Sequence, residues 1–318
     1  MNSTSSFQTG QIQENRVIRD ILLYVSPILL CIGTVGNCLA FYVLSGIKSK
    51  TSTYFFLAAL ALMDLCVLYI GLCRLWVAQL TGFDVKDTSN VLCKLVIFVG
   101  YVSSYSSTWL IVAVTLERCI AVRKPLKVLL ICKYVRAKYV VAAIIGMACL
   151  ANVHFFWTIS LTDINGSLLC SASIQCVTWI DRIWPWIDAV IYSVSPFIIL
   201  ITLNTLMIIK VCKAKRKRQS LHESQNRSGR EKAAKLPLML LTISITFLLT
   251  TLPLNAVVIS GRFWISFSEG NGHIYLYTLM KNVTELIMYV NHSINFFLYS
   301  ATGKKFRTKL KGIFRQWR

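Results

Sequence analysis

The amino-acid sequence predicts an all-α membrane protein: a seven-transmembrane helix bundle followed by a short amphipathic cytoplasmic helix. The composition indicates a membrane protein, because 55% of the residues are hydrophobic, only 15% are charged and the mean hydropathy is +0.60. A soluble chain of this length needs a larger polar share to cover its surface. The apolar residues also fall into long blocks, each close to the roughly 20 residues that a helix needs to cross a bilayer.

Seven such blocks follow one another without a linker that would divide the chain into separate domains. Backbone N–H and C=O groups in hydrocarbon must find partners within the segment, so we expect each block to form a helix. The predicted spans cover residues 21–44, 54–77, 91–122, 139–161, 184–209, 236–259 and 274–299. Residues 1–16 are predicted to form an extracellular N-terminal tail, 17–302 the seven-transmembrane bundle, and 303–318 an amphipathic membrane-surface helix with a short tail.

The position of the charges predicts the orientation in the plasma membrane. The chain has 34 Lys and Arg but only 13 Asp and Glu, a net charge of +21. Seven spans place most of the basic residues on one side, and basic residues concentrate on the cytoplasmic side of membrane proteins. We therefore expect a multi-pass protein with an extracellular N-terminus and a cytoplasmic C-terminus. The basic residues lie beside helix ends, which favours membrane lipids and an intracellular protein as partners over nucleic acid.

Two features of the predicted outer side fit this orientation. Asn2 and Asn165 each begin a glycosylation sequon. Cys93, Cys170 and Cys176 lie outside the cell or at its border, where an oxidising environment favours a disulfide. We predict a Cys93–Cys176 bridge that would hold the loop over the bundle, with Cys93–Cys170 as the alternative. No spacing of Cys and His in the sequence indicates a metal site.

Polar residues inside the predicted spans carry the functional signal, because ionisable groups in a bilayer are costly and usually functional. In chain order these motifs are Gly36-Asn37, Leu60 to Asp64, Glu117-Arg118-Cys119, Pro196, Leu252-Pro253 and the segment from Asn291 to Tyr299. Their order, one motif per expected helix, resembles rhodopsin-like (class A) G-protein-coupled receptors over most of the chain. The segment Asn-x-Ser-Ile-Asn-Phe-Phe-Leu-Tyr is similar to that of invertebrate neuropeptide receptors, including receptors for FMRFamide-like peptides.

The resemblance implies two functional clusters in the bundle. It implies a structural sodium ion, and no other cofactor, in a polar core formed by Asp64, Asn37, Ser107, Asn291 and Asn295. It implies coupling to a heterotrimeric G protein and switching through Glu117, Arg118, Pro253, Asn295 and Tyr299. A lone charged Asp64 in mid-bilayer costs at least about 2.5 kcal/mol. The alternative to sodium is therefore a neutral Asp64 that is hydrogen-bonded within the bundle.

Several positions depart from the family pattern. The Asp-Arg-Tyr motif of the family is Glu-Arg-Cys here, ending at Cys119. Phe296 replaces the proline of helix seven, and Thr251 replaces the tryptophan that usually precedes the helix-six proline. Ala233 stands where helix six often carries an acid that pairs with the helix-three arginine. These departures leave the details of switching open.

The outer half of the bundle is predicted to bind the ligand. Polar candidates that face this region are Arg74, Tyr101, Ser104, Asp188, Tyr192, Asn255 and Glu285. The two acids with nearby aromatic rings would suit a ligand that bears a guanidinium or an amine. The structural alternative is a salt bridge between Arg74 and Glu285 inside the bundle.

We therefore predict a receptor that is activated by an extracellular ligand, namely a neuropeptide, and signals through a heterotrimeric G protein. A chemosensory receptor of the same fold for small molecules is the alternative. The sequence contains no P-loop, HExxH helix or nucleophile elbow, so we do not expect an enzyme. A channel or transporter is a more distant alternative, because it would place a polar stripe through the whole bilayer.

Overall fold

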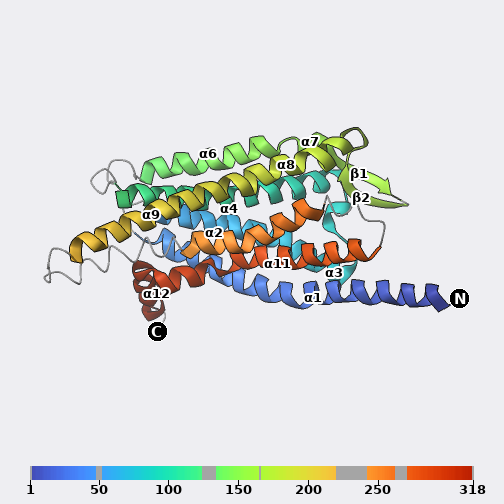
Figure 1. The fold of residues 1–318 in the computed structure, drawn as a ribbon, viewed down its shortest axis with the longest axis horizontal. Coiled ribbons are helices and arrows are strands. Elements are labelled where there is room, and N and C mark those ends of the chain that lie inside the picture. Colours follow the sequence, from blue (N-terminus) through green and yellow to red (C-terminus); the bar gives the residue numbers. More distant parts are fainter. Residues whose placement is uncertain are drawn as a thin grey trace.

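The computed structural model describes residues 2–47, 52–123, 134–164, 166–219, 242–261 and 271–316. Long helices lie side by side along the longest axis of the molecule (Figure 1). Within the described ranges, six helices are long and apolar enough to cross a membrane: Arg16–Ser45, Thr53–Thr81, Asn90–Arg123, Tyr134–Thr158, Trp179–Lys210 and Thr242–Gly261. They agree with the first six predicted spans, and the predicted helical membrane bundle is confirmed.

The first half of the chain forms three of these spans. Their elements are α1 (Asn2–Ser45), α2 (Thr53–Val67), the π-helical turn η1 (Leu68–Cys73), α3 (Arg74–Thr81), the 3₁₀ turn η2 (Val85–Asp87) and α4 (Asn90–Arg123). Gly82 ends α3 in the left-handed conformation, with φ of 69°, which glycine adopts without steric cost. Helix α4 contacts α2 and, on its other sides, the later helices α6 and α9, so it lies at the centre of the bundle.

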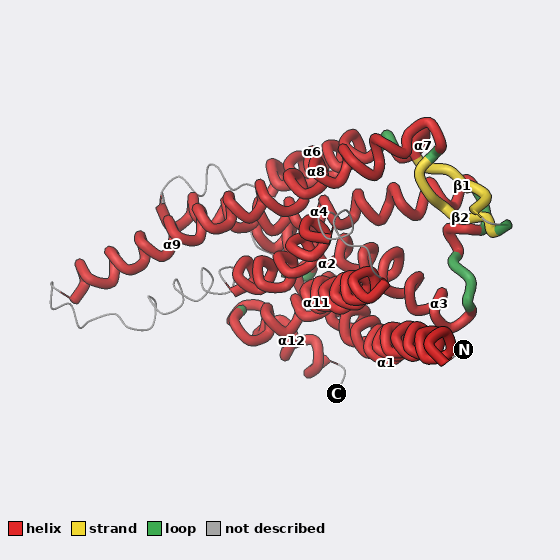
Figure 2. Tube along the Cα trace, turned by 45° about the vertical axis from the view of Figure 1, so that its right-hand side comes forward, coloured by secondary structure: helices red, strands yellow, loops and turns green. Residues whose placement is uncertain are grey.

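The middle of the chain contains two spans with a β-hairpin between them. Its elements are α6 (Tyr134–Asn152), α7 (Phe155–Thr158), β1 (Ile159–Ile164), β2 (Ser167–Ala172), η3 (Ile174–Cys176), η4 (Trp179–Ile183), α8 (Trp184–Asp188), η5 (Ala189–Val194) and α9 (Ser195–Gln219). Figure 2 shows the two strands together at one end of the bundle. We call this end the hairpin end.

The last part of the chain contains the helix Thr242–Gly261, α11 (Asn271–Thr302) and α12 (Lys304–Gln316). Helix α11 packs against α1 and α2 and corresponds to the seventh predicted span. It carries buried polar side chains, among them Asn291 and His292, and it is not one of the six helices named above as long and apolar enough to cross a membrane. Helix α12 turns away from the bundle at the end opposite the hairpin, which we call the α12 end (Figure 1).

Helix α12 is held against the bundle by one ring and one cation. Phe306 is 2% exposed and lies in the main apolar cluster, with its ring edge-on to those of Phe296 and Tyr299. The Arg307 guanidinium donates to the backbone oxygen of Ser300 at 2.9 Å. Basic side chains near a helix C-terminus satisfy its last carbonyl groups, so Arg307 caps α11. This amphipathic helix begins one residue after the predicted boundary.

The disulfide joins Cys93 to Cys170, so the predicted Cys93–Cys176 pairing is wrong. The reason is the hairpin, in which Cys170 lies opposite Leu161 and its backbone N–H donates to Asp87 of η2 at 2.7 Å. This register places Cys170 over the start of α4, where Cys93 is buried. Cys176 follows in the turn η3 and has a free thiol.

The structure does not describe the two predicted glycosylation sites. Asn165 lies outside the described residues, and nothing is described of the Asn2 side chain. Helix α1 begins at Asn2, so the polar segment predicted as a tail is helical from that residue onward. The glycosylation of both residues therefore stays a prediction.

Candidate functional site

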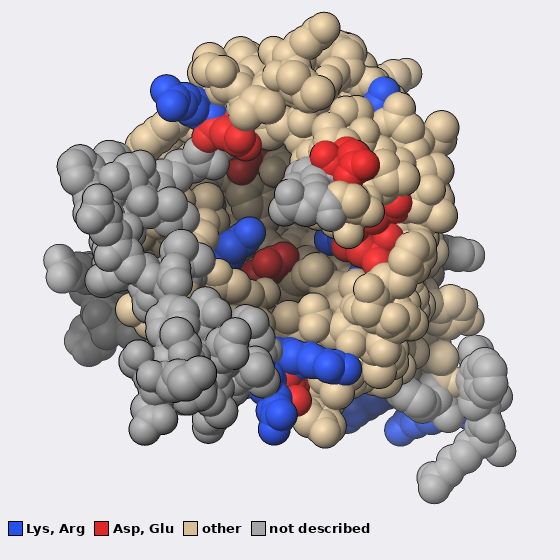
Figure 3. Space-filling model, turned by 90° about the vertical axis from the view of Figure 1, so that its right-hand side faces the viewer, with Lys and Arg blue, Asp and Glu red and all other residues tan. Residues whose placement is uncertain are grey.

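A cavity of about 280 Å³ lies within the bundle toward the hairpin end. Figure 3 views this face and shows a central hollow with acidic and basic side chains at its rim and inside it. The polar and aromatic side chains that line the cavity are Arg74, Tyr101, Ser104, Tyr105, Asp188, Tyr192, Glu285 and Tyr289. They come from α3, α4, α8, η5 and α11, so the cavity exists only in the folded bundle.

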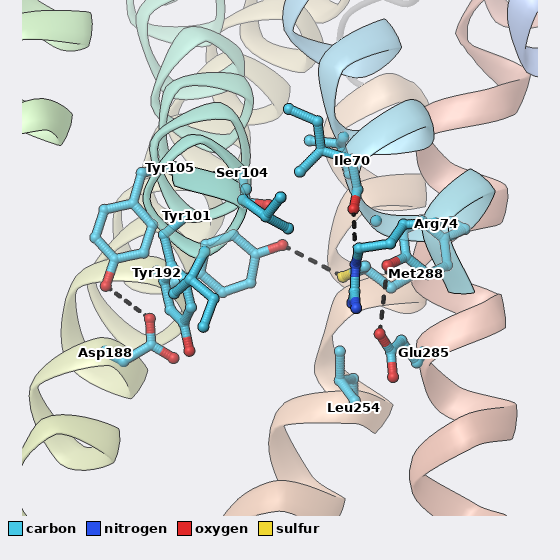
Figure 4. A pocket seen from close by; sticks show the side chains of 16 residues that line it. Ile70, Arg74, Tyr101, Ser104, Tyr105, Asp188, Tyr192, Leu254, Glu285 and Met288 are labelled. Atoms are coloured by element: carbon cyan, nitrogen blue, oxygen red, sulfur yellow. Dashed lines mark hydrogen bonds between the residues drawn. The ribbon is translucent and has the colours of Figure 1, made fainter. Parts of the chain in front are cut away.

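One wall of the cavity holds Asp188 among tyrosine rings (Figure 4). The Tyr105 hydroxyl donates to Asp188 Oδ1 at 2.6 Å. The Tyr105 ring stacks on that of Tyr192, with centroids 5.8 Å apart and an interplanar angle of 16°, and Tyr101 meets it edge-on. The Tyr192 hydroxyl reaches across to the sulfur of Met288, 3.5 Å away. This wall therefore offers one carboxylate with aromatic rings beside it.

The opposite wall holds Arg74 and Glu285 (Figure 4). The Arg74 guanidinium forms an ion pair with Asp84, at the start of η2, and its Nε donates to the backbone oxygen of Ile70 at 3.1 Å. Glu285 accepts a hydrogen bond from the Tyr289 hydroxyl at 3.3 Å. Arg74 thus pairs with Asp84 and not, as the structural alternative had it, with Glu285. The Glu285 carboxylate instead has the neutral hydroxyl of Tyr289 as its partner.

Two π-helical turns and one glycine shape the cavity. Turn η1 contributes Ile70 and Gly71, and turn η5 follows Asp188 directly and contributes Tyr192. Such turns insert an extra residue into a helix and recur at functional sites. A Cβ atom on Gly71 would lie 2.4 Å from the Tyr289 hydroxyl, so glycine at this position lets Tyr289 reach Glu285.

Six of the seven residues predicted to face a ligand line this one cavity, which brings Arg74 and Glu285 of one wall opposite Asp188 of the other. The seventh, Asn255, is not a lining residue, because its side-chain amide donates to the Thr251 carbonyl one turn earlier at 2.9 Å. Tyr105 and Tyr289, the hydrogen-bond donors to the two acids, were not among the predicted site residues. Their spacing offered a signal, because each lies one helical turn from a tyrosine or an acid already selected.

A second polar cluster surrounds Asp64, whose side chain is fully buried. Ser107 Oγ donates to Asp64 Oδ1 at 2.7 Å and Asn295 Nδ2 donates to Oδ2 at 2.6 Å, as the predicted grouping requires. Asn37 donates instead to the backbone oxygen of His292 at 2.8 Å. Among the described residues, the side-chain amide of Asn291 has no hydrogen-bond partner. His292, whose Nδ1 lies 2.8 Å from Asp64 Oδ1, was not among the predicted residues of this cluster.

The predicted coupling residues lie toward the α12 end. Glu117 and Arg118 are only 7% and 8% exposed, and Thr53 of α2 donates to Glu117 at 2.9 Å. One turn before Arg118, the Thr115 hydroxyl lies 3.0 Å from that of Ser244 and joins α4 to the helix Thr242–Gly261. Ala233, which stands where the family often carries an acid, lies outside the described residues.

The predicted switch residues of the last two helices are partly buried at Pro253 and fully buried at Asn295 and Tyr299. Pro253 lies within the helix Thr242–Gly261, and Tyr299 is fully buried in the main apolar cluster. Helix α11 continues without a break through Phe296, the residue that stands in place of the family proline. A Cβ atom on Gly36 of α1 would lie 3.1 Å from the Phe296 Cβ, so Phe296 fills the space between α11 and α1.

Comparison with known proteins identifies the architecture. The family described as "7 transmembrane receptor (rhodopsin family)" matches residues 36–299. Similar proteins are the FMRFamide receptor of Drosophila melanogaster, 24% identical over 93% of this chain and 54% of that receptor, and the galanin receptor 2a of Danio rerio, 25% identical over 92% and 78%. The growth hormone secretagogue receptor type 1 of Sus scrofa is 25% identical over 88% of this chain and 76% of its own.

The match covers most of the chain, whereas the chain spans only about half the length of the Drosophila receptor. The relatives are receptors and not enzymes, and their common architecture is a helical bundle that passes the plasma membrane several times. We conclude that this chain belongs to the rhodopsin family of seven-transmembrane receptors.

Proposed function

We propose that the chain is a receptor for an extracellular cationic peptide, which it binds in the cavity at the hairpin end, and that it signals through a heterotrimeric G protein at the α12 end. The observation that carries the ligand class is the pairing of Arg74 with Asp84. It neutralises the one basic side chain among the cavity-lining residues and leaves the carboxylates of Asp188 and Glu285 on opposite walls.

The charge balance of the cavity favours a cation. Asp188 and Glu285 each receive one hydrogen bond from a neutral tyrosine hydroxyl and have no basic partner within 4.0 Å among the described residues. A charge-assisted hydrogen bond is about twice as strong as a neutral one, and a guanidinium forms two of them with one carboxylate. The faces of Tyr101, Tyr105 and Tyr192 add cation–π attraction for the same group.

The relatives support a peptide over a small amine. All three relatives are named for the FMRFamide peptide, for galanin or for a hormone secretagogue, and the first of these ligands carries an arginine beside a phenylalanine. The cavity of about 280 Å³ is near the lower end of the volumes of ligand pockets, roughly 300–1,000 Å³, so it would take only part of a peptide. The rest of the peptide would lie in the hollow on this face (Figure 3). The ligand would thus insert its cationic end.

The orientation in the membrane rests on the charge distribution. The loops and the tail at the α12 end carry most of the 34 basic residues, and such residues remain on the cytoplasmic side. The hairpin end, with its disulfide between Cys93 and Cys170, then faces the oxidising exterior. A ligand from outside reaches the cavity, and Arg118 faces the G protein.

Signal transfer follows as a shift between two packings of the bundle. A ligand that draws Asp188 and Glu285 toward its own charge pulls α8 and α11 together at the hairpin end. The ligand shifts the equilibrium toward the active packing only by the difference between its binding free energies for the active and the inactive packing. At the other end, separation of the helix Thr242–Gly261 from α4 would expose Arg118. Pro253, which removes one helical hydrogen bond, is the pivot.

The test measures G-protein activation in cells that express the chain, with amidated peptides in two forms, one with arginine and one with citrulline. Citrulline keeps the shape of the side chain and removes its charge. We expect the arginine form to be at least about tenfold more potent, a difference of about 1.4 kcal/mol. Asp188→Asn and Glu285→Gln should each reduce this preference. Asp20→Asn, on an exposed part of α1 outside the cavity, is the matched control and should leave it unchanged.

Other outcomes would assign a different function. Equal potency of the two forms would contradict the cationic ligand class. Silence toward peptides together with a response to neutral small molecules would favour the chemosensory alternative. A ligand-gated current or a substrate flux that needs no G protein would contradict the receptor itself and favour a channel or transporter.

A further inference from the structure

The carboxylate of Asp64 already has three partners in the middle of the bundle. Ser107 and the His292 ring both contact Oδ1, at 2.7 and 2.8 Å, and Asn295 donates to Oδ2 at 2.6 Å. The side chains of Asp64 and His292 are 0% and 1% exposed, so water does not compete for these contacts. The Asp64 carboxylate therefore has the imidazole ring of His292 as a direct partner.

This donor set does not fit the sodium ion that the family resemblance implies. A hard cation such as sodium prefers oxygen ligands, whereas an imidazole nitrogen suits softer metals. The side-chain oxygens of Asn37, Asn291 and Asn295 are buried without a hydrogen-bond partner among the described residues, and such oxygens would suit the ion. The His292 Nδ1, however, lies 2.8 Å from Asp64 Oδ1, so a nitrogen already contacts the carboxylate that a cation would need. Either group can supply the proton of this contact, because the role of the ring nitrogen depends on the tautomer.

We propose that the His292 imidazole replaces sodium as the partner of Asp64, so that this receptor is insensitive to sodium ions. The ring balances or shares the charge of Asp64 by a direct hydrogen bond, and the bundle needs no ion for that purpose. A family-type site in which an ion bridges the second, third and seventh spans becomes a side-chain bridge between α2, α4 and α11.

The backbone around His292 is fixed on both sides, which holds the ring in this place. Asn37 of α1 donates to the His292 carbonyl at 2.8 Å. Ser293, the next residue, donates to the Leu29 carbonyl of α1 at 3.2 Å and to Tyr289 at 2.9 Å. If the ring left Asp64, both of its nitrogens would be buried without a partner, because Nε2 has none among the described residues.

The experiment compares the thermal unfolding of the purified receptor in sodium chloride and in choline chloride, each at about 0.15 M so that ionic screening is equal. We expect the same melting temperature for the wild type in both salts. His292→Ser exchanges the ring for an oxygen ligand and opens the space, so we expect sodium to raise its melting temperature by about 2 °C or more over choline. His154→Ser is the matched control, because that buried histidine lies near Trp184, and not at Asp64, and should show no sodium effect.

The melting temperatures of the wild type in the two salts test the proposed sodium insensitivity directly. A sodium-specific rise in its melting temperature would overturn it, since the ring would then leave room for the ion. A melting temperature of His292→Ser that is the same in sodium chloride and in choline chloride would overturn the role given to the ring. If His292→Ser cannot be purified, His292→Thr supplies the same oxygen on a larger side chain. Adding Asp64→Asn to either variant should abolish the sodium effect.

Discussion

Thr115 of α4 and Ser244 of the helix Thr242–Gly261 lie with their hydroxyl oxygens 3.0 Å apart, both buried, one helical turn from Arg118. This hydrogen bond joins the helix that carries Arg118 to the helix that carries Pro253. The position at which the family often places an acid for this purpose is Ala233 here. The hydroxyl pair therefore takes over the role of a link that holds the two helices together.

Loss of this link should raise signalling in the absence of ligand. Ser244→Ala removes one buried hydrogen bond worth about 0.5–1.5 kcal/mol, so the active packing should become about two- to tenfold more populated. Basal G-protein activation per receptor at the cell surface measures the effect. Thr250→Ala is the control on the same helix, because that hydroxyl bonds only carbonyls of its own helix. Unchanged basal activity in Ser244→Ala would show that the pair is not a constraint.

Asp84 should control the charge of the cavity from outside it. In Asp84→Asn the Arg74 guanidinium loses its partner, and we expect it to turn to Glu285 on the same wall. A cationic ligand would then lose potency by about tenfold, or about 1.4 kcal/mol. The double variant Asp84→Asn with Arg74→Gln should recover much of the loss, because no cation then competes for Glu285. Dose–response curves measure both, and no recovery would contradict this competition.

Substitution of Cys170 should lower surface expression and melting temperature, whereas substitution of Cys176 should not. Cys170→Ser breaks the disulfide to Cys93, and loss of a native disulfide costs about 2–5 kcal/mol, so surface expression and melting temperature should fall. Cys176→Ser is the matched control and should leave both near the wild-type values. Peptide mapping without reduction checks the pairing directly. A peptide that links Cys93 to Cys176 would contradict the structure.

Phe306 should hold α12 against the bundle. Phe306→Ala removes a ring that is 2% exposed and packed against Phe296 and Tyr299, and such core truncations cost about 3–5 kcal/mol. The melting temperature should therefore drop clearly. Phe297→Ala is the control, because that ring is 52% exposed and would face lipid. Equal losses in both variants would show that α12 contributes little to the bundle.

The sequence predicts the spans well because hydrocarbon leaves the backbone little choice. A block of about 20 apolar residues must form a helix to satisfy its N–H and C=O groups, wherever it packs. The hairpin β1–β2 was not predicted, because it lies outside the bilayer, where this constraint ends. The disulfide partner was predicted wrongly because the hairpin was not predicted. Its strand register decides that Cys170 and not Cys176 meets Cys93.

For the cavity, the lining residues could be predicted from the sequence but their hydrogen-bond and ion-pair partners could not. The residues on its walls could be predicted from the depth of polar side chains in each span, and six of seven line it. Their partners could not be predicted, because the sequence offers Arg74 two acids, Glu285 in the seventh span and Asp84 in the loop that follows Arg74. The choice of Asp84 depends on the turn η2. His292 was missed for another reason, since motif comparison directs attention to the residues that match and not to the one that differs.

The most direct test of the receptor assignment is G-protein activation by a cationic amidated peptide in cells that express the wild type or Arg118→Ala at equal surface density. Arg118 is buried at the end of α4, and Arg123→Ala, an exposed position on the same helix, is the matched control. The account predicts a dose-dependent response of the wild type and of Arg123→Ala, and loss of that response in Arg118→Ala with peptide binding retained. A full response in Arg118→Ala would contradict it.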